Sequence, residues 1–534
     1  RKAPPGVIRE PATADLAAPG RIEQITARGA ATRGGALALS DARGEWTWRE
    51  LEQGRKKLAE LLLTLGVRAG DRVMVVAENC ATLVAVLFAV TSVGAWVVSV
   101  NARLSPRELD AVRAHCTPRR VLCLGDDSAD ARHHAERMQA TRLSLGRWGT
   151  ISVTALDERS LPEPIADRAG DDVAALLYTT GTTGEPKGVM LTHANLLFIA
   201  RVSGELRRLT QDDRVYGLLP LSHVYGLASV CMGTLHAGAS LHLQARFNPA
   251  SMTEFLASHA ITVCQGVPAM YAKLLEHLRG RGEKLKAPQL RFLYAGGSPL
   301  APALKRQVES TLGLPLHNGY GLTEASPTLT QTRHDEPRAD CSVGRALPGV
   351  ELRIVDMEGR DVPAGEPGEF WARGPNIMKG YYRDPHATAE AIRPGGWLAT
   401  GDIARQGADG AYFIEGRLKE LIIRSGFNVN PVEVEAVLNS HPDVTHSAVV
   451  GRKTGDGEEE VVAFVELAAG ARATPEVLLE YAAGMLAPYK RPCEVIAIGA
   501  LPTAANGKVL KNRLAQMARA REAVPTSPSG PAAR

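Results

Sequence analysis

The chain has 534 residues, which at about 150 residues per domain corresponds to roughly three or four structural units. Hydrophobic residues make up 45% and charged residues 22%, an ordinary globular composition that excludes a disordered or fibrous chain. The formal net charge is +4 and no long basic block occurs, so neither nucleic acid nor an anionic membrane is an implied partner. The seven cysteines are scattered and form no CxxC pair, which favours reduced thiols and a cytoplasmic location over disulfides or a zinc site.

The first 130 residues hold one stretch that could be mistaken for a membrane span. Residues 1–16 contain no apolar h-region and are therefore not a signal peptide. Residues 81–100 carry no charge and are long enough to cross a bilayer. However, a β-rich run at 73–77 precedes them, and Gly94 divides them into a helix-length half and a strand-like half. The pattern predicts a buried strand–helix–strand unit and no integral membrane segment.

The middle of the chain alternates short apolar strands with amphipathic helices. Strand-like runs at 214–222, 261–268, 290–298 and 314–321 end in Gly, Pro or Ser, which indicates an α/β fold with largely parallel sheets. From about Val343 shorter strands and Gly/Pro turns indicate a β-rich subdomain. After residues 416–420 a compact α/β segment of roughly a hundred residues suits an independent domain. The last residues, 521–534, are rich in Pro, Ser and Ala, and we expect them to be disordered.

The segment Leu177–Gly188, LYTTGTTGEPKG, is the most informative part of the sequence. Glycines allow backbone N–H groups to approach phosphate oxygens, hydroxyls add donors, and a lysine adds a positive charge. The residues that would do so here are Thr179, Thr180, Gly181, Thr182, Thr183, Gly184 and Lys187. A Walker A loop is excluded because Gly188 stands where that motif needs Ser or Thr. The pattern predicts a phosphate-binding loop, with a solvated turn between two strands as the alternative.

Together with later motifs, this loop resembles the acyl-adenylate-forming (AMP-binding) superfamily, which includes acyl-CoA synthetases, adenylation domains of peptide synthetases and firefly-type luciferases. The motifs follow the order of that family: LPLSHVYG (219–226), LYAGGSPL (293–300), NGYGLTEASP (318–327), TGD (400–402), GRLKELIIRSGFNVNPVEVE (416–435) and LPTAANGKVLKNRL (501–514). The resemblance covers nearly the whole chain. It implies a large N-terminal AMP-binding domain (1–415) of two stacked α/β subdomains plus the β-rich subdomain, a hinge (416–420), and a small mobile α+β C-terminal domain (421–520).

The resemblance also implies roles for individual residues at the nucleotide. An aromatic side chain with glycines suits adenine stacking, and a carboxylate beside a nucleotide suits Mg²⁺ held partly by substrate phosphates. Tyr320 and Gly319 are implied to lie against adenine, Thr323 to donate to the α-phosphate, and Glu324 to ligate Mg²⁺. Asp402 and Arg417 are implied at the ribose, and Lys508 at the reacting carboxylate and α-phosphate. The implied nucleotide set also includes Gly297, Asn318 and Gly321, and the implied catalytic set includes Lys187.

The remaining implied residues concern the acid, coenzyme A and domain motion. His223, Gly296, Gly297 and Gly321 are implied at the acyl pocket. Ser425 and Gly426 are implied near a pantetheine tunnel, and Lys419 is implied as the residue about which the C-terminal domain rotates. Asp402 is interpreted as lying at the end of a short strand, and His223 at a strand end.

We therefore predict an AMP-forming acid–thiol ligase that converts a carboxylic acid, ATP and CoA into acyl-CoA, AMP and pyrophosphate, with Mg²⁺ as cofactor. One alternative is an amino-acid or acyl adenylation enzyme that loads a carrier protein, but no acidic residue follows LPL to pair with an α-ammonium group. Another is a non-catalytic scaffold, against which the joint presence of Lys187, Glu324, Asp402, Arg417 and Lys508 argues. Aryl, medium-chain and long-chain acids all stay open as substrates, as does self-association into a homodimer.

Overall fold

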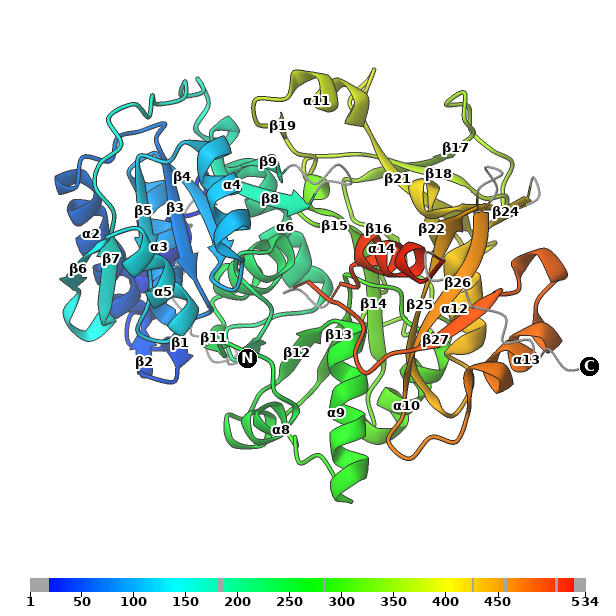
Figure 1. Cartoon of the computed structure of the whole chain (residues 1–534). Coiled ribbons are helices and arrows are strands. Elements are labelled where there is room, and N and C mark those ends of the chain that lie inside the picture. Colours follow the sequence, from blue (N-terminus) through cyan, green and yellow to red (C-terminus); the bar gives the residue numbers. More distant parts are fainter. Residues whose placement is uncertain are drawn as a thin grey trace, which may run out of the picture.

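The computed structural model describes residues 19–180, 186–282, 284–424, 427–454, 459–504 and 508–522. Within these residues the strands form sheets of nine, eight, five, three and two strands (Figure 1). The fold is the predicted mixed α/β arrangement, with largely parallel sheets followed by a β-rich region and a separate C-terminal α/β segment.

The eight-stranded sheet carries the predicted phosphate loop. Its central strands β8, β4, β3 and β5 pair in parallel, and antiparallel strands extend the sheet at both edges. In spatial order the strands are β19 (Gly380–Tyr381), β9 (Pro186–Thr192), β8 (Val173–Thr180), β4 (Trp96–Asn101), β3 (Arg72–Ala77), β5 (Arg120–Cys123), β7 (Thr150–Val153) and β6 (Thr141–Ser144). The edge strand β19 comes from much later in the chain, so the sheet joins the loop to the region after residue 374.

The nine-stranded sheet carries three further motifs of the large domain, 219–226, 293–300 and 318–327. Its parallel strands β10, β12, β13 and β14 end in the segments that the sequence analysis singled out. In spatial order the strands are β16 (Arg345–Ala346), β15 (Thr328–Gln331), β14 (Leu316–Gly321), β13 (Phe292–Ala295), β12 (Val263–Gly266), β10 (Arg214–Gly217), β11 (Ser240–Leu243), β1 (Leu37–Asp41) and β2 (Gly44–Thr47). Carboxyl ends of neighbouring parallel strands meet at one sheet edge, where ligands of α/β proteins bind.

Helices pack between and around these two sheets, and one continuous core cluster contains residues of both sheets and of the helices between them. The helices of the large domain are α1 (Gln24–Arg33), α2 (Trp48–Thr64), α3 (Ala81–Ser92), α4 (Pro106–Cys116), α5 (Ala129–Arg137), α6 (His193–Leu206), the π-helix η3 (Tyr225–Met232), α7 (Gly233–His236), α8 (Pro249–Ser258), α9 (Pro268–Arg281), α10 (Pro302–Leu312) and α11 (Pro385–Ala391), with single 3₁₀ turns at η1 (Gly146–Trp148), η2 (Ala169–Asp171) and η4 (Thr323–Ala325).

The apolar stretch 81–100 is the buried strand–helix–strand unit that its pattern predicts. Helix α3 is almost wholly buried, and β3 and β4 on either side of it pair in parallel. Gly94 takes φ +74, and a Cβ there would lie 2.9 Å from Cβ of Ala69, so this turn requires glycine. In the part of the chain that the structure describes, no helix is both long and apolar enough to cross a membrane.

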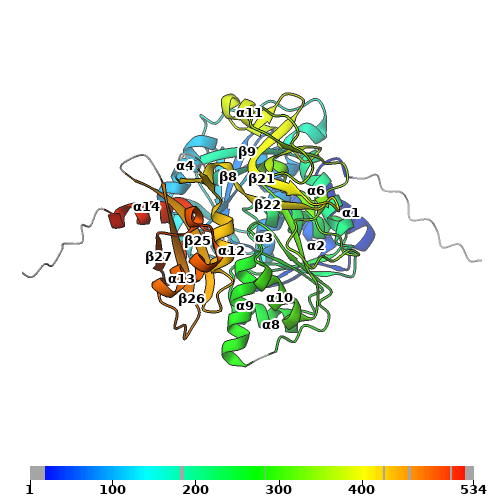
Figure 2. The ribbon, with the colours of Figure 1, turned by 90° about the vertical axis from the view of Figure 1, so that its right-hand side faces the viewer.

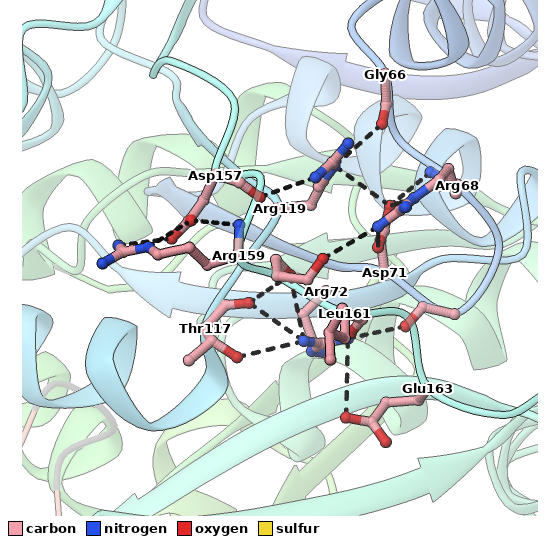
Figure 3. Close-up of polar contacts among 12 residues, drawn as sticks. Gly66, Arg68, Asp71, Arg72, Thr117, Arg119, Asp157, Arg159, Leu161 and Glu163 are labelled. Carbon is pink, nitrogen blue, oxygen red and sulfur yellow. Dashed lines mark hydrogen bonds and ion pairs between the residues drawn. The ribbon is translucent and has the colours of Figure 1, made fainter.

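A buried arginine fixes the segment that follows β7. Figure 3 shows the fully buried Arg72 of β3 donating to the carbonyl oxygens of Leu161 (2.7 Å) and Thr117 (3.3 Å) and lying 3.8 Å from the carboxylate of Glu163. Buried guanidinium groups are stable only when they are hydrogen-bonded and paired. The network therefore holds Glu163 beside Gly70, just before the start of β3.

The β-rich region (yellow) and the C-terminal segment (orange to red) lie away from the blue and cyan strands of the eight-stranded sheet (Figures 1 and 2). The β-rich sheet contains β17 (Glu351–Val355), β18 (Gly368–Arg373), β20 (Ile392–Arg393), β21 (Trp397–Gln406) and β22 (Tyr412–Arg417). After the 3₁₀ turn η5 (Leu418–Glu420) come β23 (Ile422–Arg424), β24 (Phe427–Val429), α12 (Pro431–Leu438), β25 (Val444–Lys453), β26 (Glu459–Leu467), α13 (Pro475–Met485), η6 (Pro488–Lys490), β27 (Glu494–Ala497) and α14 (Lys511–Glu522). This segment has core clusters of its own, as an independent unit needs.

Candidate active site

The predicted phosphate loop connects β8 to β9. The two strands pair in antiparallel register, so Thr179 stands directly opposite Lys187. This register places one hydroxyl and the cation of the motif side by side at the end of the hairpin. Four further loop residues of the motif, Gly181, Thr182, Thr183 and Gly184, lie outside the described residues, and only the backbone of Thr180 is described.

Strand β14 brings the predicted adenine residues to the carboxyl edge of the nine-stranded sheet. Asn318 is buried and donates to the carbonyl oxygens of Cys341 and Ser342, both at 3.2 Å. At Gly319 a Cβ would lie 2.0 Å from the hydroxyl oxygen of Tyr294, so only glycine fits there. At Gly321 a Cβ would lie 2.0 Å from the carbonyl oxygen of Pro327, which gives this glycine a packing role as well.

Tyr320, Asp402 and Arg417 form one polar group. The Tyr320 hydroxyl donates to Oδ2 of Asp402 at 2.5 Å, and Nε of Arg417 donates to Oδ1 of the same carboxylate at 2.7 Å. Burial, together with the nearby Asp402 charge, raises the pKa of Tyr320 well above its ordinary value, so the phenol stays protonated. Asp402 and Arg417 are direct cross-strand neighbours on β21 and β22. Asp402 lies in the middle of the ten-residue strand β21, so the prediction that it ends a short strand is wrong.

Glu324 lies in the turn η4, directly after β14. Its Oε1 accepts a hydrogen bond from the Tyr381 hydroxyl at 2.7 Å, and its carbonyl oxygen accepts one from the Met378 amide at 2.9 Å. Thr323, beside it, is buried. Among the described residues no group of three or more His, Cys, Asp or Glu side chains could hold a metal. A single carboxylate fits a Mg²⁺ ion whose other ligands are substrate phosphates and water, which is how Mg²⁺ is commonly held at nucleotides.

Lys508 reaches this site from the C-terminal segment. It lies on a short antiparallel bridge formed by Thr503 and Val509, and its side chain remains accessible to solvent. The surrounding protein nevertheless reduces its hydration, and this, with repulsion from Arg417, lowers the pKa of the Lys508 ammonium group. The charges of Glu420, Asp402 and Glu324 act on it in the opposite direction. Lys508 is thus within electrostatic reach of both predicted nucleotide carboxylates.

His223 lies within electrostatic reach of Lys508. Burial, and then the positive charge of Lys508, lowers the pKa of His223 to about 4, so its imidazole is neutral at pH 7. Its amide donates to the carbonyl oxygen of Pro220, and its own carbonyl oxygen accepts from Leu227 at the start of η3. His223 therefore stands in the turn before η3, six residues after β10 ends, and the prediction of a strand end is wrong.

The two glycines after β13 stand against aromatic side chains. A Cβ at Gly296 would lie 3.1 Å from Cε1 of Tyr294 and 3.5 Å from the Tyr225 ring and its hydroxyl oxygen. Gly297 takes φ +80 and has Val267 as its neighbour at 3.6 Å. The structure thus brings Gly296 together with Tyr225 and Tyr294.

The connector between the two parts of the chain is tied at both ends. Arg417 bonds to Asp402 on one side of Lys419, and on the other side Glu420 pairs with Nζ of Lys511 at 3.0 Å. Lys511, at the start of α14, also pairs with Glu435 at 2.8 Å. The predicted coenzyme A residues Ser425 and Gly426 lie outside the described residues.

Sequence reasoning missed three tyrosines of this region. Tyr225 and Tyr294 are part of motifs that were recognised, and their position beside Gly226 and Gly296 is the signal that could have found them. Tyr381 gave no such signal, because its contact with Glu324 joins residues that are 57 positions apart in the sequence.

Comparison with known proteins identifies the family. The chain matches the model of the AMP-binding enzyme over residues 26–382 and that of the AMP-binding enzyme C-terminal domain over residues 433–508. The chain belongs to the AMP-binding enzyme family. It is 35% identical to a feruloyl-CoA synthase of Amycolatopsis sp over 93% of this chain and 97% of that protein. It is 34% identical to 4-coumarate–CoA ligase 2 of Oryza sativa subsp. japonica over 88% of this chain and 87% of that protein.

Solved structures of AMP-binding enzymes agree with this assignment. ATP-bound MatB from Rhodopseudomonas palustris superposes with a TM-score of 0.81 at 31% identity, covering 93% of this chain and 98% of the other. An anthranilate–CoA ligase in complex with anthranoyl-AMP gives a TM-score of 0.84 at 25% identity, covering 96% and 99%.

These relatives place the chain in the acyl-CoA synthetase branch of the family. It is an AMP-forming acid–thiol ligase, which joins a carboxylic acid to ATP as an acyl adenylate and then transfers the acyl group to CoA. The predicted family, fold class and reaction are confirmed. The roles of single residues and the domain boundaries remain predictions.

Proposed function

We propose that this ligase activates an aromatic acid that carries an oxygen substituent on its ring. The observation that carries the proposal is the pair of tyrosines at the predicted acyl pocket. Tyr225 and Tyr294 meet edge to face with ring centres 6.1 Å apart, and both border Gly296, where a Cβ would lie 3.1 Å from the Tyr294 ring and 3.5 Å from the Tyr225 ring. Flat aromatic walls beside a glycine favour a flat ring over a flexible chain, because aromatic pairs gain from edge-to-face and offset contacts.

Two buried glutamines near Tyr294 support an oxygen substituent on the ring of the substrate. Gln265 stands opposite Tyr294 on the neighbouring strand, and Gln331 stands opposite Gly319. The Tyr294 hydroxyl lies beside Gly319. Because paired residues on neighbouring strands point the same way, both glutamines and Tyr294 share one face of the sheet. Both glutamines are buried, and within the described residues neither atom of either side-chain amide has a hydrogen-bond partner. Buried amides without partners are costly, and a substrate oxygen or an ordered water would relieve that cost.

A buried arginine strengthens the same end of the pocket. The guanidinium carbon of Arg207 lies 4.8 Å from the centre of the Tyr294 ring, and the group donates to the carbonyl oxygen (3.1 Å) and hydroxyl (2.8 Å) of Ser229. Its Nε has no partner within the described part of the chain. A cation held here favours a hydroxyl or other oxygen acceptor on the substrate. The relatives named after feruloyl, 4-coumarate and indoleacetate groups support an aromatic acid.

We assign the first half-reaction to the charges gathered at the nucleotide edge. Attack of a carboxylate on the α-phosphorus of ATP brings two anions together, so positive charge and hydrogen-bond donors must face the reacting atoms. Lys508, Lys187 and Thr323 would supply them, while Tyr320, Asp402 and Arg417 would hold adenosine. A Mg²⁺ ion at Glu324 would neutralise phosphate charge. The thiol of CoA then attacks the acyl adenylate after Lys508 has moved away about Lys419.

The thiols support a cytoplasmic location for this reaction. All seven cysteines are free, and five of them are buried. Burial raises the pKa of the Cys80, Cys231 and Cys264 thiols to about 12, so these side chains stay protonated and unreactive. Such cysteines suit a reducing compartment.

A product assay over a panel of acids tests the proposal. The panel should contain benzoate, hydroxylated and methoxylated benzoates and cinnamates, and fatty acids of several lengths, each with ATP, Mg²⁺ and CoA. We expect AMP and pyrophosphate as products and the highest kcat/KM with an oxygen-substituted aromatic acid. Formation of ADP and phosphate would contradict the adenylate chemistry, and a fatty acid as best substrate would contradict the aromatic assignment alone.

A further inference from the structure

Tyr381 touches both residues that are proposed to face the ATP phosphates. Its hydroxyl donates to Oε1 of Glu324 at 2.7 Å. Its ring lies under the ammonium group of Lys187, with Nζ 5.2 Å from the ring centre. One side chain therefore spans from the proposed magnesium ligand to the lysine of the phosphate loop.

The backbone around Tyr381 is fixed to the same two elements. Strand β19 pairs with β9 so that Tyr381 stands opposite Val189, two residues from Lys187. The next amide, of Tyr382, donates to the carbonyl oxygen of Gly188 at 2.8 Å, and on the other side the Met378 amide donates to Glu324. Since main-chain bonds hold both ends, the ring has little freedom to leave its place between Glu324 and Lys187.

This position has two physical consequences. A hydroxyl that donates to one carboxylate oxygen orients the carboxylate and leaves its other oxygen to face a cation. The face of an aromatic ring attracts an ammonium group, which holds Lys187 without neutralising it.

We propose that Tyr381 is a positioning residue that sets Glu324 and Lys187 for the magnesium-bound triphosphate of ATP. The inference rests on the proposed roles of Glu324 and Lys187. It adds a residue that touches neither the acid nor CoA and acts through its two neighbours.

The chain offers a matched control at the next position. Tyr382 is buried, and its hydroxyl donates to Glu163, the carboxylate that Figure 3 shows beside Arg72. Its ring packs against Trp96 and His115, whereas Tyr381 contacts Glu324 and Lys187. Tyr381→Phe and Tyr382→Phe each remove one hydroxyl that donates to a glutamate and leave the ring in place.

The experiment measures ATP binding by calorimetry on the full chain, with Mg²⁺ and with excess EDTA, beside the melting temperature of each variant. We expect Tyr381→Phe to weaken binding of Mg²⁺–ATP about tenfold, because a hydrogen bond to a charged group is lost, and to change binding in EDTA far less. Tyr382→Phe should bind Mg²⁺–ATP like the parent. Equal affinities of the two variants in Mg²⁺ would overturn the inference.

Glu324→Gln separates this inference from the proposed function. If Glu324→Gln binds Mg²⁺–ATP as the parent does, the proposed role of Glu324 fails. If Glu324→Gln binds weakly but Tyr381→Phe binds normally, only the role of Tyr381 fails. In the Glu324→Gln background, Tyr381→Phe should cause little further loss of Mg²⁺–ATP affinity, and a full additional tenfold loss there would show that Tyr381 does not act through Glu324.

Discussion

At the residue scale, Lys508 carries the most specific expectation. Glu324, Asp402, Arg417 and His223 lie within electrostatic reach of its ammonium group. Only adenylation joins two anions, so only that half-reaction needs the cation in its transition state. Lys508→Ala should slow adenylate formation by about 10²–10³-fold, the usual cost of one such contact, and should spare thioester formation from a supplied acyl adenylate. Single-turnover measurements of the two half-reactions check this, and equal losses in both would mean that Lys508 has another role.

His223 gives a prediction about pH. Because burial and Lys508 lower its pKa to about 4, His223 is neutral from pH 5.5 upward and does not change charge near neutrality. His223→Phe should therefore alter KM for the acid while the shape of the pH–rate profile between pH 5.5 and 8 stays that of the parent. If the rate of the parent changes with pH near 6.5 and that of the variant does not, His223 titrates in this range and acts as a base.

At the element scale, the turn η5 is where rotation of the C-terminal segment would occur. Lys419 lies between the Arg417–Asp402 contact and the Glu420–Lys511 ion pair, so a rotation about it would carry Lys511 and the nearby Lys508 together. Proline fixes φ near −65°, so Lys419→Pro should restrict this rotation. We expect it to slow thioester formation from preformed adenylate far more than it slows adenylation, with Lys419→Ala near the parent as control. Parental rates of acyl-CoA formation in the proline variant would place the hinge elsewhere.

At the scale of the whole molecule, the residues of the proposed acyl pocket come from elements that are distant in sequence. Arg207 follows α6, Ser229 lies on the π-helix η3, and Tyr294 lies on β13. Arg207→Met should lower kcat/KM about tenfold for a ring-hydroxylated acid and much less for the unsubstituted acid. The reason is that the substitution removes a charged hydrogen-bond donor but keeps an unbranched side chain of similar length. Arg208→Met is the control, since Arg208 is exposed and pairs with Asp335 at the surface. An equal loss of kcat/KM for both acids would mean that Arg207 only stabilises the fold.

The sequence by itself determined the features that depend on neighbouring residues. The strand–helix–strand unit at 73–100 and the α/β class follow from local patterns of apolar residues and glycines. The motifs likewise identified Glu324, Asp402, Arg417 and Lys508, because each stands within a short and specific string of residues.

Only the tertiary structure decided how these parts act on one another. The placement of Asp402 in mid-strand, the neutral state of His223, the burial of the Gln265 and Gln331 amides and the contact of Tyr381 with Glu324 depend on how segments far apart in the chain pack together. Burial and electrostatic neighbours depend on which sheets and segments pack together, and periodicity reports only which face of an element is apolar. For this reason the chemistry of the enzyme could be predicted from its sequence, whereas the positioning of its side chains required the fold.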